Sequence, residues 1–232
     1  MGDGRPGGDP GCGCRVGNEF GDRAARHDLT AYRKSGPGTT TRWLIEGLEA
    51  GGVEGMTVLD IGAGVGAVHQ QLLADGALAA IDVDGSPAYV TAAREEAARR
   101  GTADRVRYEV GDFVELAPGI GESDIVALDR VICCYPDMPS LVTLSVARAR
   151  RRYGLVYPRD TWWIRAGARL LNGLARLGRQ RVRAYVHRTA DVEAIVRPAG
   201  FLPRFRRDGL FWQVAVYERG LPLSAGDSPD RL

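Results

Sequence analysis

The sequence has no apolar run that approaches the roughly 20 residues needed to span a bilayer, so no transmembrane helix is expected. Residues 1–10 consist mainly of glycine, proline and aspartate and hold no apolar stretch of the kind found in a secretory signal. The four cysteines, two of which are adjacent, are too few to form a disulfide framework. These absences predict a cytoplasmic protein that has no membrane partner.

Lysine is almost missing as well, because Lys34 is the only one among 31 basic residues. The arginines are spread unevenly: residues 148–219 hold 17 of them against five acidic residues, a net charge of +12. Since the whole chain carries +2, the rest of it carries −10. A basic C-terminal third beside an acidic body indicates a nucleic-acid partner, an anionic small substrate or simply a solvated face.

The chain has 232 residues, of which 44% are hydrophobic, and this is enough for one domain with a sizeable core. We expect residues 1–20 to form a flexible leader and residues 221–232 a flexible tail. The domain between them, residues 21–220, is predicted to begin with helices at residues 21–52. A helical insertion at residues 158–190 is expected to act as a lid.

Short apolar strands alternate with helices along the middle of the chain, which indicates βαβ units and a parallel sheet. The predicted strands are residues 56–61, 77–83, 106–110, 125–128 and 153–157, with helices ending near Ala74 and spanning residues 87–100 and 141–149. Two further strands, residues 201–206 and 210–217, are joined through Asp208-Gly209, which favours an antiparallel hairpin. The predicted fold is therefore α/β: a doubly wound, mostly parallel seven-stranded sheet closed by an antiparallel C-terminal hairpin, as in Rossmann-like proteins.

The segment from Val58 to Gly66 reads Val-Leu-Asp-Ile-Gly-Ala-Gly-Val-Gly and carries most of the functional information. Glycines at the end of a first strand allow a tight turn and a close approach of the backbone to a ligand. The N–H groups of the next helix would point at the same place. With Ala67 as a third small residue the loop also suits a dinucleotide, so an NAD-type oxidoreductase is one alternative.

Acidic residues accompany the ends of three predicted strands. Asp60, inside the loop signature, would repel a pyrophosphate but suits a ligand with a cationic amino group. Asp84 follows the first glycine of the loop by 22 residues, the usual separation for a carboxylate that binds ribose hydroxyls, and Asp82 competes for this role. Asp112 is placed to meet an adenine amino group beside the aromatic side chain of Phe113. Together these residues indicate an adenosine ligand without phosphates.

This order of residues resembles the class I S-adenosylmethionine-dependent methyltransferases over residues 56–217, and the closing hairpin is part of the resemblance. The resemblance implies S-adenosyl-L-methionine as the cofactor. We prefer Asp84 for the ribose because Ser86-Pro87 matches the Asp-x-Ser-Pro pattern of that family. The cofactor-binding residues implied on this chain are Asp60, Gly62, Ala63, Gly64, Gly66, Asp82, Asp84, Asp112, Phe113 and Asp129.

The acceptor is expected beside the end of the fourth predicted strand, at residues 128–137. Asp129 and Tyr135 are candidates for positioning or deprotonating it, although Asp129 could instead end the strand by pairing with Arg130. His187 is the preferred base for a hydroxyl acceptor because its ordinary pKa is near neutrality. A carboxylate acceptor needs no base and would be held by arginines. The candidates for that contact are Arg130, Arg159 and Arg183.

Residues 183–201 and Tyr135-Pro136 resemble in part the magnesium-protoporphyrin IX O-methyltransferases, which methylate a propionate carboxylate. Cys134 stands where that family usually has histidine, so its substrate does not transfer. What the resemblance implies is a helical insertion that could close over a flat or apolar acceptor. Because the arginine surplus favours an anionic one, we expect O-methylation of a carboxylate or hydroxyl on a small, anionic or aromatic acceptor by in-line transfer.

An RNA methyltransferase or RNA binder is the main alternative, and the arginines at residues 148–152 are its strongest support. Against it, lysine is scarce and the aromatic residues do not alternate with basic ones as in a stacking platform. An oxidoreductase is less favoured, because Asp60 and the closing hairpin argue against it. The cysteines are spaced more closely than zinc ligands usually are, so no metal site is expected. They are Cys12, Cys14, Cys133 and Cys134.

Overall fold

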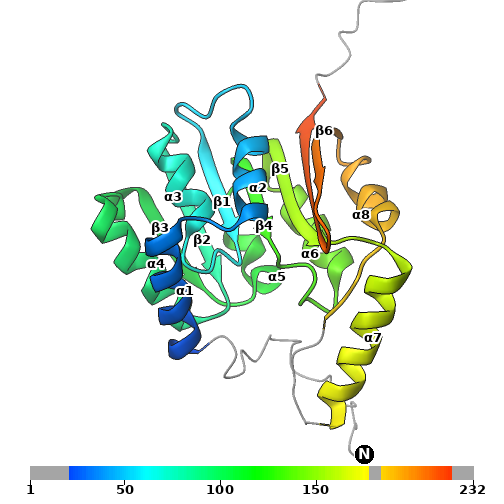
Figure 1. Cartoon of the computed structure of the whole chain (residues 1–232). Helices are drawn as coiled ribbons and strands as arrows, with labels where there is room; N and C mark the ends of the chain where they lie inside the picture. Colours follow the sequence, from blue (N-terminus) through cyan, green and yellow to red (C-terminus); the bar gives the residue numbers. More distant parts are fainter. Residues whose placement is uncertain (1–20, 178–183, 221–232) are drawn as a thin grey trace, which may run out of the picture.

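The computed structural model describes residues 21–177 and 184–220, and they contain one seven-stranded sheet. The strand order is β3-β2-β1-β4-β5-β7-β6 (Figure 1). The strands are β1 (Thr57–Ile61), β2 (Ala79–Asp84), β3 (Val106–Val110), β4 (Ser123–Asp129), β5 (Ala149–Pro158), β6 (Phe201–Asp208) and β7 (Trp212–Arg219). The predicted leader, the predicted tail, Cys12, Cys14 and Arg183 lie outside the described residues.

The first five strands pair in parallel, and β7 pairs antiparallel with both β5 and β6. The predicted fold, a mostly parallel sheet closed by a C-terminal hairpin, is therefore confirmed. The strand order reverses between β1 and β4, and ligands of open α/β sheets bind beyond the carboxyl ends of the strands at such a point. The topology thus places the end of β1 and the end of β4 on one crevice.

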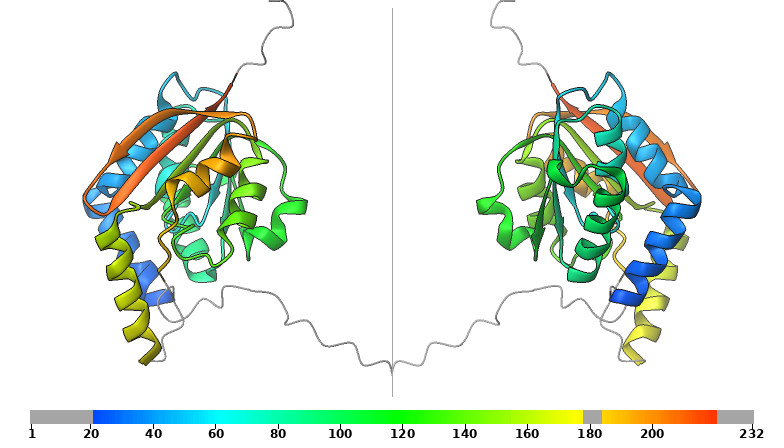
Figure 2. Two further views of the ribbon diagram at one scale, coloured as in Figure 1. Left: turned by 90° about the vertical axis from the view of Figure 1, so that its right-hand side faces the viewer. Right: turned by 90° about the vertical axis from the view of Figure 1, so that its left-hand side faces the viewer.

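Helices cover both faces of the sheet (Figures 1 and 2). One face carries α2, α3 and α4, with α1 packed on α4, and the other carries α5, α6 and α8. The helices are α1 (Asp22–Ser35), α2 (Thr39–Glu49), α3 (Ala67–Ala74), α4 (Pro87–Arg100), α5 (Phe113–Leu116), α6 (Met138–Val146), α7 (Trp162–Leu177) and α8 (Thr189–Val196). Because both faces are covered, the central strands are buried: Ile125–Leu128 of β4 is a continuous apolar run, and β1 is buried from Val58 to Ile61.

The start of β5 differs from the sequence prediction. Residues 149–152 were expected to lie outside a strand, and the structure extends β5 back to Ala149 and ends α6 at Val146. In this added part of β5, Arg150 and Arg151 are exposed and Arg152 is buried. The Arg152 guanidinium donates to the carbonyls of Leu48 and Gly52 at 2.6 and 2.7 Å, which compensates for its burial.

Helix α7 begins at the C-terminal edge of the sheet, just after β5, and extends away from the rest of the domain (Figure 2). It occupies most of the insertion predicted at residues 158–190. A role as a lid stays a prediction. None of the helices within the described part of the chain is long and apolar enough to cross a membrane.

Candidate functional site

The glycine loop between β1 and α3 has the backbone that its sequence predicts. Gly62, Gly64 and Gly66 have φ angles of 64°, 58° and 81°, a region that residues with a Cβ rarely adopt. A Cβ at Gly62 would lie 2.6 Å from Val131, and one at Gly66 would lie 2.6 Å from the ring of His69. A Cβ at Gly64 would lie 3.8 Å from the ring of Tyr89, an ordinary van der Waals distance, so the backbone there is less crowded than at Gly62 or Gly66.

Asp84 lies directly against this loop. Its Oδ2 accepts a hydrogen bond from the N–H of Gly64 at 2.9 Å, and its Oδ1 accepts one from the N–H of Ser86 at 2.8 Å. Burial raises the pKa of Asp84, and the two backbone donors oppose that rise. The carboxylate is half-buried, and each oxygen keeps a further lone pair for a hydroxyl donor.

Asp82, the competitor for the ribose, has a different environment. Its side chain is fully buried, and neither carboxylate oxygen has a hydrogen-bond partner among the described residues. Burial raises its pKa well above the ordinary value, and the nearby carboxylates of Asp60 and Asp84 add to the rise. A group enclosed in this way is less accessible to a ligand than Asp84.

Asp60 is turned inward beneath the loop. Its Oδ2 is 2.9 Å from Nδ1 of His69 and accepts the N–H of that residue at 3.3 Å. Both side chains are fully buried, and His69 holds the Asp60 carboxylate in place. Oδ1 of Asp60 has no partner in the part of the chain that the structure describes. A direct contact of Asp60 with a cationic amino group stays a prediction.

Asp112 and Tyr135, predicted for different roles, are in contact. Asp112 caps α5 by accepting the N–H of Val114 at 2.9 Å. The hydroxyl of Tyr135 donates to Oδ1 and Oδ2 of the same carboxylate at 3.0 and 2.9 Å. Phe113 packs in the core and is 4% exposed, so its ring does not line an open surface. The geometry thus joins Tyr135 to the predicted adenine side of the site.

Asp129 lies at the end of β4, where two neighbours hold its carboxylate. The hydroxyl of Thr41 donates to Oδ2 at 2.6 Å, and Nε of Arg130 donates to Oδ1 at 3.1 Å. The pairing with Arg130 that the sequence suggested is therefore present. Arg130 has a φ of 62°, the one positive φ outside glycine in the described chain. Such backbone strain is most often found at functional sites.

His187 lies beside the segment that follows β4. Its Nε2 is 2.8 Å from the carbonyl oxygen of Ile132, and its ring stacks on Tyr185 with centroids 6.0 Å apart. Because a carbonyl only accepts hydrogen bonds, Nε2 carries the proton and Nδ1 carries the lone pair of the neutral ring. Burial lowers the pKa of His187, which keeps the ring neutral at neutral pH.

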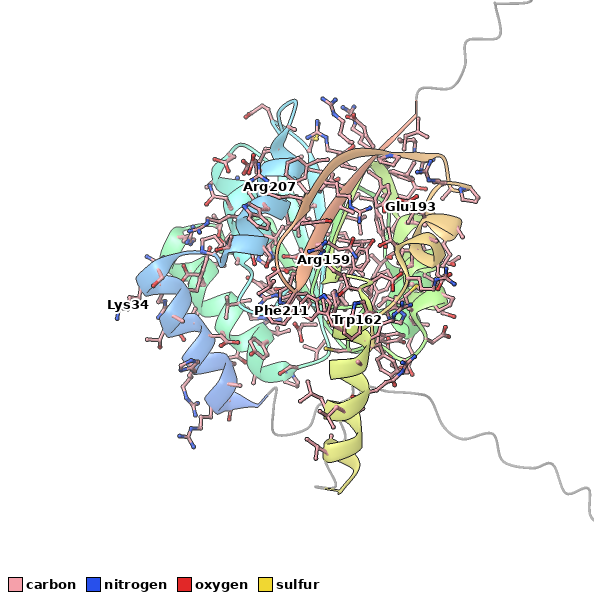
Figure 3. All side chains as sticks on the ribbon, turned by 45° about the vertical axis from the view of Figure 1, so that its right-hand side comes forward. Lys34, Arg159, Trp162, Glu193, Arg207 and Phe211 are labelled. Carbon is pink, nitrogen blue, oxygen red and sulfur yellow. The ribbon has the colours of Figure 1, made fainter. Side chains whose placement is uncertain are left out.

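Three further residues named from the sequence are Arg159, Cys133 and Cys134. Arg159 lies at the β6–β7 turn (Figure 3), where it donates to the carbonyl of Gly209 at 3.0 Å and pairs with Asp208 at 3.7 Å; its contact with a carboxylate of the acceptor stays a prediction. Cys133 is buried, Cys134 is exposed, and their sulfurs are 3.7 Å apart without a disulfide. No group of three or more potential metal ligands occurs within residues 21–177 and 184–220.

Comparison with known proteins agrees with this geometry. Residues 58–152 match the family model of a methyltransferase domain. The chain contains a methyltransferase domain. The family predicted from the glycine loop and its acidic partners is thereby confirmed, although no curated protein matches the sequence.

Solved structures share the fold of this methyltransferase chain. Magnesium protoporphyrin IX methyltransferase from Synechocystis PCC 6803, solved with bound SAH, is 20% identical; the match covers 94% of this chain and 90% of that one, with a TM-score of 0.62. An O-methyltransferase family protein from Burkholderia thailandensis is 18% identical over 85% of this chain and 60% of that one, with a TM-score of 0.66. A putative methyltransferase solved in complex with the Trm112 activator of Haloferax volcanii gives 16% identity over 88% and 97%, with a TM-score of 0.63.

Sequence reasoning about the site missed two contacts. Thr41 was not named as a site residue, and it reaches Asp129 across 88 positions in the chain. Tyr89 was not named either, and its hydroxyl donates to Asp28 at 2.6 Å, which ties α1 to the loop side of α4. No local motif signals such long-range contacts.

Proposed function

We propose that the protein transfers a methyl group from S-adenosyl-L-methionine to a carboxylate or hydroxyl oxygen of a small-molecule acceptor. The observation that carries the proposal is the half-buried carboxylate of Asp84, held against the backbone of Gly64 by a hydrogen bond of 2.9 Å. A carboxylate that follows the first glycine of such a loop by this many residues suits the vicinal hydroxyls of a ribose. The backbone at Gly64 is less crowded than at Gly62 and Gly66, which favours the approach of an adenosine ligand there.

The residues present fit this cofactor. Asp84 would hold the ribose, Asp112 the adenine amino group, and the loop at Gly62–Gly66 the amino acid part of the ligand. Asp112 can accept a further hydrogen bond while Tyr135 donates to it, because each carboxylate oxygen has more than one lone pair. When bound, S-adenosylmethionine supplies a methyl group already activated by the sulfonium charge.

The residues beside the end of β4 would position the acceptor. Asp129 is fixed by Thr41 and Arg130, so its carboxylate offers a defined hydrogen-bond acceptor. Arg130 is exposed and lies at the same edge, where it would pair with a carboxylate of the acceptor. For a hydroxyl acceptor, Nδ1 of neutral His187 would take the proton.

Titration calorimetry with S-adenosylhomocysteine tests the cofactor site. We expect the parent to bind this ligand and not NADH, while Asp84→Ala and Gly64→Val each abolish binding. The first variant removes the ribose acceptor. The second places a β-branched side chain at a φ of 58°, which distorts the loop. Asp104→Ala removes an exposed carboxylate and should bind like the parent. If either loop variant binds like the parent, the site assignment is wrong.

The pH dependence of methyl transfer separates the two acceptor classes. With a hydroxyl acceptor, kcat should fall as the pH drops below the pKa of His187, which lies below its ordinary 6.5, because the protonated ring cannot accept a proton. His187→Ala should lower kcat about 100-fold with such an acceptor and little with a carboxylate. Equal losses with both classes would show that His187 serves the structure rather than proton transfer.

A further inference from the structure

Two adjacent cysteines follow β4 and have no part in the proposed methyl transfer. Cys133 is buried, Cys134 is exposed, and their sulfur atoms lie 3.7 Å apart. The two sulfurs of a disulfide are about 2.05 Å apart, so this pair is close to bonding distance before any bond has formed. An accessible thiol beside a protected one is the arrangement typical of cysteines that respond to oxidants.

The surroundings give the two sulfurs different roles. The thiol of Cys133 donates to the carbonyl of Arg130 at 3.1 Å, and since a carbonyl only accepts hydrogen bonds, this contact keeps the proton on Cys133. The hydrogen bond with Cys134 and burial both raise the pKa of Cys133. Contact with the Cys133 thiol lowers the pKa of Cys134 to about 7; partial burial opposes this effect, and the Arg130 charge adds to it. Cys134 is therefore the nucleophilic thiolate of the pair.

The backbone that carries the pair also holds part of the site. The carbonyl of Cys133 accepts the N–H of Tyr185 at 2.7 Å, and Tyr135 donates to both carboxylate oxygens of Asp112. Neighbouring Cα atoms are about 3.8 Å apart, whereas bridged cysteines usually have theirs about 4.4–6.8 Å apart. A bond between Cys133 and Cys134 therefore has to shift the backbone next to Tyr135. Such a shift moves the Tyr135 hydroxyl away from Asp112.

We propose that hydrogen peroxide converts Cys133 and Cys134 into a reversible disulfide, and that this bridge weakens the binding of the cofactor. The thiolate of Cys134 attacks one oxygen of the peroxide: the S–O bond forms, the O–O bond breaks, and the leaving hydroxide takes up the proton that Cys134 lost. The sulfur of Cys133 then attacks the sulfenic sulfur: the S–S bond forms, the S–O bond breaks, and the thiol proton leaves with the hydroxide. Two thiols are thus oxidised while one peroxide is reduced to two waters.

Mass spectrometry tests the bridge in a chain with Cys12→Ser and Cys14→Ser, which retains only the adjacent pair. Free thiols are blocked with iodoacetamide before trypsin releases both cysteines in the peptide of residues 131–148. After treatment with hydrogen peroxide we expect this peptide to lack two hydrogen atoms and to carry no blocking group, and dithiothreitol to reverse the change. Cys133→Ser should stop at a sulfenic acid that dimedone traps, and Cys134→Ser should form neither product.

Titration calorimetry with S-adenosylhomocysteine tests the effect on the site. The Kd of the bridged chain should be about tenfold higher than that of the reduced chain, the effect of losing one charge-assisted hydrogen bond. In Tyr135→Phe the same oxidation should change the Kd little, because both changes remove one contact. Cys134→Ser is the matched control, and its Kd should not respond to peroxide. This effect rests on the proposed function, whereas the mass measurement does not, so a reduced chain that fails to bind the ligand would contradict the function and not the bridge.

Three results would overturn the proposal. A peptide that gains oxygen without losing two hydrogen atoms would mean that Cys134 is oxidised alone. A dimer cross-linked through Cys134, seen by electrophoresis without reductant, would assign the thiol to a contact between two copies of the chain. A bridged chain that binds S-adenosylhomocysteine as tightly as the reduced chain would separate the cysteines from the cofactor site.

Discussion

At the scale of single residues, the enclosed carboxyl group of Asp82 should make stability depend on pH. Its native pKa lies above the value of 3.8 for an ordinary aspartate, because of its burial and the neighbouring Asp60 and Asp84, and the Arg94 charge only partly opposes this. Between these two pKa values the native state holds a proton that the unfolded state has lost. The free energy of unfolding therefore falls as the pH rises, by up to about 1.4 kcal/mol per pH unit.

Urea unfolding between about pH 5 and pH 8 measures this effect. Asp82→Asn cannot ionise, so its stability relative to the parent should increase with pH. Asp104→Asn, which changes an exposed carboxylate, should show no such trend. A constant difference between the parent and Asp82→Asn across this range would mean that Asp82 is ionised in the native protein throughout.

Tyr135 also has a residue-scale test, because its position favours a role in cofactor binding over one in catalysis. Tyr135→Phe removes the donor that holds both oxygens of Asp112. We expect the Kd for S-adenosylhomocysteine to rise about tenfold, the effect of losing one charge-assisted hydrogen bond, while kcat at saturating cofactor changes little. A large drop in kcat with an unchanged Kd would instead place Tyr135 at the reacting atoms.

At the scale of elements, the buried guanidinium of Arg152 joins β5 to the end of α2. It satisfies the carbonyl of Leu48, in the last turn of the helix, and that of Gly52, just beyond it. Arg152→Ala would leave these groups without their donor, and the free energy of unfolding should fall by about 3 kcal/mol. Arg150→Ala, which changes an exposed neighbour on the same strand, should cost no more than about 0.5 kcal/mol in the same chemical denaturation experiment.

The elements also show which features a sequence reveals. The glycine loop, β1 and the hairpin turn at Asp208-Gly209 were predictable, because local backbone preferences and apolar periodicity determine them. The buried state of Arg152 was not, because its partners lie about 100 positions away in the chain. The same holds for the contact between Tyr135 and Asp112: both residues were named as site candidates, but only the folded sheet brings them together.

At the scale of the whole molecule, part of the basic third of the chain pairs with the acidic remainder. Arg207 pairs with Glu46 at 2.7 Å, and Arg150 pairs with Glu122 at 3.2 Å. Arg148, in the densest arginine cluster, donates to the carbonyl of Ala117 at 2.7 Å. Part of the arginine cluster thus has partners within the chain.

We therefore expect RNA affinity to be weak and non-specific. A fluorescence anisotropy titration with a short single-stranded RNA should show a Kd no tighter than about 10⁻⁴–10⁻⁶ M at physiological salt. Tighter binding with a steep dependence on salt, lost in a variant with Arg150 and Arg151 changed to glutamine, would restore the RNA methyltransferase as the leading alternative.

The position of β7 bears on how the protein is made in the cell. This strand is the last in the described part of the chain, yet it lies between β5 and β6 and hydrogen-bonds to both. Until residues 212–219 have been made, the parallel strands can pair but the edge of β5 stays open. An open edge is a template for aggregation, so the nascent chain stays vulnerable until β7 is available to pair. Closure of the sheet therefore waits for the synthesis of β7.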